Sequence, residues 1–142
     1  MDYLVAVDGS DTSRDAVGHA CRLATRSDGA VAPAHAIDPS SYSVAQAPGS
    51  PERSGSLEAA TARGEEVLAA AAERVASSAV PVADTHLRYG DPVTKLAEVA
   101  TEAGYDGVVV GHRGTSAEYD RVLGSVATGL VGQCDVPVTV VG

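Results

Sequence analysis

The residues best suited to chemistry lie in a glycine-bearing stretch late in the chain. Gly111, Gly114 and Gly124 follow a run of valines at 108–110, and Ser125 comes directly after the last glycine. Glycine lets a backbone approach a ligand closely and adopt positive φ angles. A helix that begins at Gly-Ser offers unpaired backbone N–H groups and the positive end of its dipole, which favour an anion. The pattern therefore predicts a phosphate cradle.

Side chains in the same stretch have several possible roles. Arg113 could neutralise phosphate charge, project into solvent or pair with an acidic residue of the loop. Thr115 and Ser116 could donate hydroxyl hydrogen bonds to phosphate. His112 fits a solvent-facing or backbone-bonded histidine better than a catalytic base.

The glycines also have a purely structural interpretation, in which they serve only turns. Gly111 would then end a strand, and Gly124 would open a helix. That interpretation leaves Ser125 unexplained, because a serine at a helix start can both cap the helix and donate to phosphate.

The sequence contains no recognisable constellation for chemistry on a bound phosphate. It lacks the Gly-x4-Gly-Lys-[Ser/Thr] and His-Glu-x-x-His patterns, and Gly-x-Gly-x-x-Gly is absent after the first predicted strand. The histidines fall on separate predicted elements without ligand spacing, and His35 fits a core or sheet histidine. We therefore expect no catalytic residue and no protein-bound metal, and any hydrolysis of a bound phosphate should be slow.

Composition argues against two classes of partner. The 142 residues carry a formal net charge of −9, and Lys95 is the single lysine. Proteins bind nucleic acids and anionic membranes through clustered Lys and Arg, so we expect neither as a partner. Abundant acids and few lysines resemble halophilic proteins, whose surface repulsion is screened to a Debye length of about 3 Å at 1 M salt. An acidic protein of a mesophile with a GC-rich genome is the alternative.

The cysteines and the apolar runs bear on the compartment. Cys21 and Cys134 form no C-x-x-C pair and lie in apolar helical contexts, where buried thiols are expected. No apolar run reaches the roughly 20 residues that span a bilayer. We expect a cytoplasmic protein with one domain over residues 1–142.

Predicted strands and helices alternate along the chain. The strands are expected at 3–7, 30–37, 80–88, 105–110 and 136–141, and the helices at 12–26, 57–78, 92–103 and 125–133. The segment 38–56, rich in Pro, Ser and Gly, is expected to be a long loop. Regular alternation predicts an α/β fold with an open five-stranded parallel sheet, order 3-2-1-4-5, and helices on both faces.

The strand order brings two distant signals together. Ligands of such folds bind beyond the carboxyl ends of the strands, where the winding reverses. Asp8 follows the first strand and Gly111 ends the fourth, and these strands are neighbours in the predicted order. Asp8 could line a ligand site there, or it could cap the first helix or bind its own turn.

The spacing Gly-x2-Gly-x9-Gly-[Ser/Thr] after an apolar strand resembles the nucleotide-binding signature of the universal stress protein family. The stretches Val5–Ser10, Gly90–Pro92 and Cys134–Val141 are also similar to the family. The resemblance covers nearly the whole chain except 38–56. It implies a Rossmann-like fold and the ATP-binding subgroup of the family.

The resemblance also implies a site and a mode of action. The ligand would be ATP, or ADP or AMP, with Mg²⁺ on phosphate oxygens. Backbone groups of the 111–117 loop and the helix start would hold the phosphates, and groups near the ends of the first two strands would flank ribose and adenine. The phosphate-binding set is Gly111 to Ser116 with Gly124, Ser125, Val126 and Ala127. The set that flanks ribose and adenine is Ala6, Asp8 and Ala36. The nucleotide state would order the loops and change the surface offered to an unidentified protein partner.

A homodimer through the last strand is implied as well, and the apolar strand 136–141, without lysine, fits an edge that pairs. Two other functions stay open. The chain could be a dimeric interaction scaffold without nucleotide, although it keeps the glycine pattern that such members usually lack. It could also be an ATP-hydrolysing enzyme of related fold, such as an ATP pyrophosphatase, but its 8–13 turn does not match the Ser-Gly-Gly-x-Asp-Ser loop of those enzymes.

Overall fold

The computed structural model describes residues 1–42, 56–112 and 123–142, and over these residues strands and helices alternate as predicted. The strands are β1 (Tyr3–Ala6), β2 (Val31–Ile37), β3 (His86–Tyr89), β4 (Gly107–Gly111) and β5 (Val138–Val141). The α-helices are α1 (Asp11–Ser27), α2 (Leu57–Ser77), α3 (Pro92–Glu102) and α4 (Ser125–Gln133), and a 3-10 helix, η1, spans Pro39–Tyr42.

The five strands form one parallel sheet in the order β3-β2-β1-β4-β5, which confirms the predicted topology. β1 is the central strand. Its Val5 lies opposite Pro33 of β2 and Val109 of β4. The winding therefore reverses at β1, where one crossover leads toward β2 and the other toward β4.

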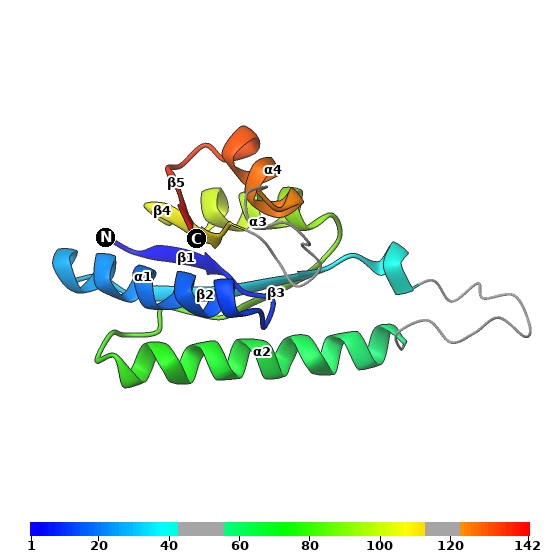
Figure 1. Ribbon diagram of the computed structural model, residues 1–142, viewed down its shortest axis with the longest axis horizontal. Helices are drawn as coiled ribbons and strands as arrows, with labels where there is room; N and C mark the ends of the chain where they lie inside the picture. Colours follow the sequence, from blue (N-terminus) through cyan, green and yellow to red (C-terminus); the bar gives the residue numbers. More distant parts are fainter. Residues whose placement is uncertain (43–55, 113–122) are drawn as a thin grey trace, which may run out of the picture.

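Helices cover both faces of the sheet (Figure 1). Side chains alternate between the faces along a strand, so Val5 and Val109 pack with α1 and α2, while Leu4 and Val108 pack with α3 and α4. The sequence has no Phe and no Trp, and Ala, Val and Leu side chains make up most of both layers of the core. None of the helices in the described part of the chain is long and apolar enough to cross a membrane.

The third strand differs most from its predicted range. β3 begins at His86, and Val82 makes only an isolated bridge to Val31. Pro81 has no N–H to donate to a ladder, and the Asp84 carboxylate accepts the N–H of Thr85 at 2.8 Å. Such a local bond competes with strand pairing. The strand prediction over 80–85 was therefore wrong apart from that bridge.

Two smaller predictions also need correction. Residues Pro39–Tyr42, predicted as loop, form η1, and Asp38 accepts the N–H of Ser40 at 2.9 Å at its start. Cys21 is buried as predicted, but Cys134 is only half-buried because it lies at the C-terminal end of α4. Both thiols are free, and burial raises the pKa of each.

Candidate functional site

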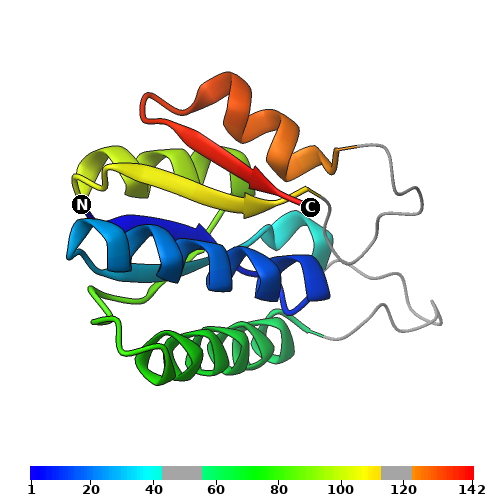
Figure 2. The same cartoon turned by 60° about the vertical axis from the view of Figure 1, so that its left-hand side comes forward.

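The carboxyl ends of β1, β2 and β4 meet at one edge of the sheet, on the side where α1 and α4 begin (Figure 2). Ala6 ends β1 and Gly111 ends β4. Ala36 lies on β2, two residues beyond Ala34, the register partner of Ala6. The fold thus brings together three predicted site residues from distant parts of the chain.

The backbone of Ala36 extends past the end of β1. The N–H of Val7 donates to the carbonyl of Ala34 at 2.9 Å, so the polar groups of Ala34 face β1. Alternate residues of a strand address the same neighbour, and therefore the N–H and C=O of Ala36 also face that side. At this level β1 has already ended, so the polar groups of Ala36 lie beyond the last residue of β1.

Asp8 sits in a tight turn between β1 and α1. Its carboxylate accepts hydrogen bonds from the N–H of Ser10, at 2.9 Å, and from the Ser10 hydroxyl. Gly9 between them has a φ of +85°, in the left-handed region that favours glycine. The Ser10 hydroxyl in turn accepts the N–H of Ser13 at 3.2 Å, so Ser10 is the N-cap of α1. Asp8 therefore binds its own turn, as one predicted alternative stated, and a contact with ligand stays a prediction.

The first turn of α1 packs directly on the end of β4. A Cβ atom on Gly111 would lie 2.9 Å from the carbonyl carbon, the carbonyl oxygen and the hydroxyl of Thr12. The Thr12 and Ser10 hydroxyls are 3.2 Å apart. Gly111 is thus required by helix packing, and the same contact joins the Asp8 turn to the predicted phosphate loop.

His112 closes the base of that loop. Its carbonyl accepts the N–H of Gly124 at 2.6 Å, and its N–H donates to the carbonyl of Val141 in β5 at 2.7 Å. The imidazole packs on Gly142, where an added Cβ would lie 2.9 Å from Nδ1. This Nδ1 atom is buried, and it has no hydrogen-bond partner among the described residues. The bonds of His112 bring the start of α4 to the end of β4.

The start of α4 differs from that of the other helices. Ser10, Ser56 and Asp91 cap α1, α2 and α3 through their side chains. The N-cap residue of α4 is Gly124, with no side-chain hydrogen bond to the helix.

Ser125 is the first helical residue rather than the cap, so the prediction that its hydroxyl caps the helix was wrong. The first helical bond runs from the N–H of Thr128 to the carbonyl of Gly124 at 3.0 Å. The N–H groups of Ser125, Val126 and Ala127 thus have no partner within the helix. Gly124 has a φ of −63°, which any residue can adopt. Its backbone conformation therefore does not require glycine, unlike the packing at Gly111.

The other predicted loop residues, Arg113, Gly114, Thr115 and Ser116, lie outside the described residues, and their roles stay predictions. In the described ranges, no three His, Cys, Asp or Glu side chains gather as metal ligands.

A buried polar pair outside the predicted site was not predicted from the sequence. His86 Nε2 and the Tyr105 hydroxyl are 2.7 Å apart, and their rings meet edge to face at 5.6 Å. Burial lowers the pKa of His86 and raises the pKa of Tyr105. His86 begins β3, where it is the register partner of Ala34, and Tyr105 precedes β4. Their sequence separation left no local pattern that could reveal the contact.

The geometry described so far is that of a doubly wound α/β protein with a helix N-terminus at its switch point. A model of the universal stress protein family matches residues 2–142, and the chain belongs to that family. A search of curated proteins found no match.

Solved structures show the same fold. A universal stress protein in complex with cAMP is 27% identical with a TM-score of 0.73, and the alignment covers 100% of this chain and 96% of that one. A universal stress protein from Archaeoglobus fulgidus is 20% identical with a TM-score of 0.77, with 100% and 93% covered. An Archaeoglobus fulgidus universal stress protein in complex with dAMP is 19% identical with a TM-score of 0.75, with 100% and 98% covered.

Proposed function

We propose that this protein binds an adenine nucleotide, ATP with Mg²⁺, and acts as a nucleotide-dependent regulatory module. The observation that carries the proposal is the start of α4, which has no side-chain cap and lies at the switch point of the sheet. Unpaired N–H groups and the helix dipole favour phosphate at such a place. The relative bound to cAMP supports the ligand class, since cAMP carries adenine, ribose and phosphate.

Each part of the nucleotide has a candidate partner. The N–H groups of Ser125, Val126 and Ala127 would bind the phosphates together with the loop that begins at Gly111. Asp8 would face ribose hydroxyls, because a carboxylate repels phosphate. The backbone N–H and C=O of Ala36 would pair with the edge of adenine.

The residues present fit Mg²⁺ held by the nucleotide. Mg²⁺ keeps several waters and binds through phosphates plus at most a few carboxylates. The described residues offer no cage of three ligands, so phosphate oxygens would carry most of the coordination. When bound, the ion neutralises phosphate charge next to a protein whose net charge is −9.

Two features favour a regulatory role over a catalytic one: the sequence lacks a lysine for phosphate cleavage, and the phosphate loop connects to two helices. The sequence has no P-loop lysine to promote phosphate cleavage. The phosphate loop starts at Gly111, which packs against α1, and ends at Gly124, where α4 begins. Ordering of this loop by a ligand would therefore affect both helices. We infer one cytoplasmic domain over residues 1–142 whose nucleotide state changes the surface offered to a protein partner.

A titration tests the nucleotide proposal. ATP, ADP, AMP and cAMP are added with and without Mg²⁺, at low and molar salt, to the wild type, Gly114→Asp and Gly132→Asp. A charge at 114 should abolish binding by repelling phosphate. Gly132→Asp is the matched control, since a Cβ at Gly132 would meet none of the described residues within 4 Å and Gly132 lies near the other end of α4. Equal affinity of the wild type and Gly114→Asp would overturn the cradle. No binding to the wild type would favour the scaffold, and rapid turnover an enzyme.

We further propose a homodimer through the open edge of β5. The carbonyl of Pro137 accepts the N–H of Val108 in β4, and the carbonyl of Val141 accepts the N–H of His112 just beyond it, so the polar groups of Val138 and Val140 face away from β4. Val140→Pro should therefore remove an outward N–H and leave monomers in light scattering, with the sheet intact. Thr139→Pro should instead lower stability, because its N–H faces β4. A dimeric Val140→Pro variant would exclude this edge as the interface.

A further inference from the structure

His35 makes a hydrogen bond that links the sheet to the Asp8 turn. Its Nδ1 atom lies 2.7 Å from the carbonyl oxygen of Val7, the residue before Asp8. A carbonyl oxygen only accepts, so Nδ1 carries the proton in this contact. The imidazole thus holds the peptide plane that leads into Asp8, just beyond Ala6, the last residue of β1.

Helix α2 holds the imidazole from the other side. Gly64 of α2 is buried, and a Cβ added there would lie 2.7 Å from His35 Cδ2 and 3.3 Å from Nε2. The next turn of α2 reaches the Asp8 turn itself, since a Cβ on Gly9 would lie 3.3 Å from Val67 Cγ2. Both ends of the His35 contact are therefore packed against one helix.

The turn beyond Val7 is a continuous set of hydrogen bonds. Asp8 accepts from Ser10, and Ser10 accepts from Ser13 in α1. A rotation of the Val7–Asp8 peptide would shift the carboxylate and strain this set. An imidazole fixed between β1 and α2 opposes that rotation at the Val7 carbonyl, and the Ser13 hydroxyl, which accepts the Asp8 N–H at 3.4 Å, opposes it at the other end of the peptide.

We propose that His35 is a positioning residue, which through its Nδ1–H group sets the Asp8 carboxylate for the sugar hydroxyls of the nucleotide. This inference rests on the proposed function for the ligand, but the tautomer of His35 and the order of the turn do not depend on it. His35 itself touches no ligand in this scheme.

The binding test compares His35→Leu, which removes the donor, with His35→Asn, whose amide nitrogen can replace Nδ1. His19→Leu in α1 is the control for loss of an imidazole. His35→Leu should weaken ATP binding about three- to tenfold, the effect of one neutral hydrogen bond. His35→Asn should restore affinity to within about twofold, and His19→Leu should leave it unchanged. Equal losses in His35→Leu and His35→Asn would overturn the proposal.

A double-mutant cycle separates positioning from general destabilisation. In an Asp8→Asn background, His35→Leu should cost less than about twofold in ATP affinity, since the group that it positions is already altered. Full additivity of the two losses would mean that His35 acts only on stability, and it would overturn the proposal. Thermal unfolding of each variant checks that the sheet is folded during the titrations.

Two readouts work without nucleotide. The ¹⁵N spectrum of the wild-type imidazole at pH 8 should show the Nδ1–H tautomer, and an Nε2–H tautomer would overturn the proposal. Amide exchange at Gly9 and Ser10 should be faster in His35→Leu than in the wild type and His35→Asn, and unchanged rates would overturn it. If the wild type binds no nucleotide but both readouts hold, the proposed function fails and the positioning of the turn stands.

Discussion

The glycine at position 111 can be explained by packing against α1 or by phosphate binding, and a stability measurement tests the packing explanation. Thr12 leaves no room for a Cβ at this position. Gly111→Ala should therefore displace the first turn of α1 and lower the free energy of unfolding by about 1–3 kcal/mol. Urea denaturation measures this change. Gly132→Ala is the control, since a Cβ there would have no atom of the described residues within 4 Å, and it should be neutral or raise stability by up to about 1 kcal/mol. Equal stability of both variants would contradict the packing role.

His86 should make stability depend on pH. Burial lowers its pKa in the folded state below the usual 6.5, partly offset by Asp84, while Arg88 adds to the lowering. The unfolded chain then binds the proton more readily, so the free energy of unfolding should fall as the pH drops below about 6.5. The contribution of His86 to the free energy of unfolding is fully present above that pH, and it is lost as the pH falls through the pKa of His86 in the folded state.

Denaturant titrations between pH 7.5 and pH 5 test this expectation. His86→Leu should be less stable than the wild type at pH 7.5, because the Tyr105 hydroxyl loses its partner. Its stability should depend less on pH, however. A slope as steep as that of the wild type would show that other groups cause the dependence. His19→Leu should keep the wild-type slope.

Residue positions at the carboxyl edge were predictable because topology alone decides them. Ala6, Asp8, Ala36 and Gly111 converge once the strand order is known, and the alternation of elements predicts that order. The contacts of individual side chains were not predictable in this way. Ser10 caps α1 because of the Asp8 turn, which depends on the left-handed φ of Gly9.

Elements were predicted well where the local signals agreed and poorly where they conflicted. Asp91-Pro92 placed the start of α3 correctly, since aspartate caps a helix and proline favours its first turn. At 80–85, β-branched residues favoured a strand, but Pro81 and the local bond of Asp84 oppose pairing. Which of these signals dominates depends on whether β2 offers partners there, and that is a tertiary property.

Two serine caps allow a matched test of whether the start of α1 is coupled to the ligand site. Ser10 and Ser56 each accept an N–H at the third helical position, of Ser13 and Ala59. Alanine at either position should cost about 0.5–2 kcal/mol of unfolding free energy. Only Ser10→Ala should also weaken nucleotide binding, because Ser10 holds the Asp8 carboxylate. Equal effects of both variants on ATP affinity would argue against a role for this turn in the site.

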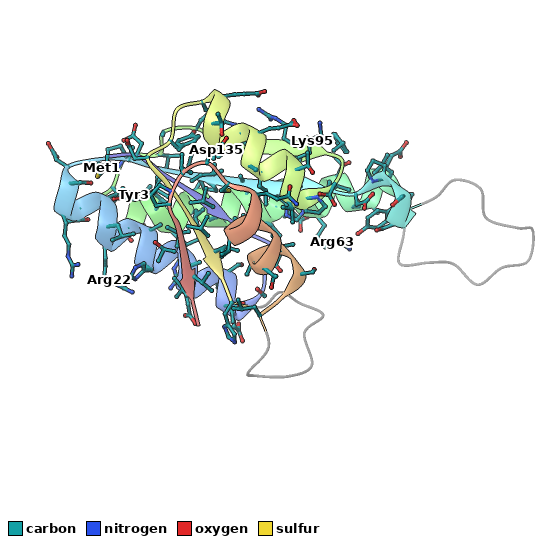
Figure 3. The ribbon with its side chains drawn as sticks, turned by 90° about the horizontal axis from the view of Figure 1, so that it is seen from above. Met1, Tyr3, Arg22, Arg63, Lys95 and Asp135 are labelled. Atoms are coloured by element: carbon teal, nitrogen blue, oxygen red, sulfur yellow. The ribbon has the colours of Figure 1, made fainter. Side chains whose placement is uncertain are left out.

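At the scale of the whole molecule, the surface charge is largely uncompensated. The formal net charge is −9, and in the described ranges the ion pairs are Arg14–Asp11 at 2.9 Å and Lys95–Glu98 at 3.4 Å. Both pairs link residues three apart on one helix, so neither ties distant elements together. Repulsion between acidic side chains should therefore oppose the compact state at low ionic strength. Figure 3 shows that the labelled Arg63 and Lys95 lie well away from Met1 and Tyr3.

Salt should therefore stabilise the protein. The midpoint of thermal unfolding should rise between 0.1 and 2 M KCl, by about 3–6 °C for each kcal/mol gained. Replacing Glu65, Glu66 and Glu73, all exposed on α2, by glutamine should raise the low-salt midpoint and reduce the salt effect. A midpoint independent of KCl would exclude adaptation to high salt and favour an acidic mesophilic protein.

The contact between Gly111 and Thr12 also affects how related sequences should be interpreted. A relative that no longer binds the ligand should still keep glycine at 111, because a Cβ there would clash with Thr12 of α1. Glycine at 124, with its ordinary φ, would be free to drift. The second position should therefore carry more diagnostic information about binding than the first, although both belong to one signature.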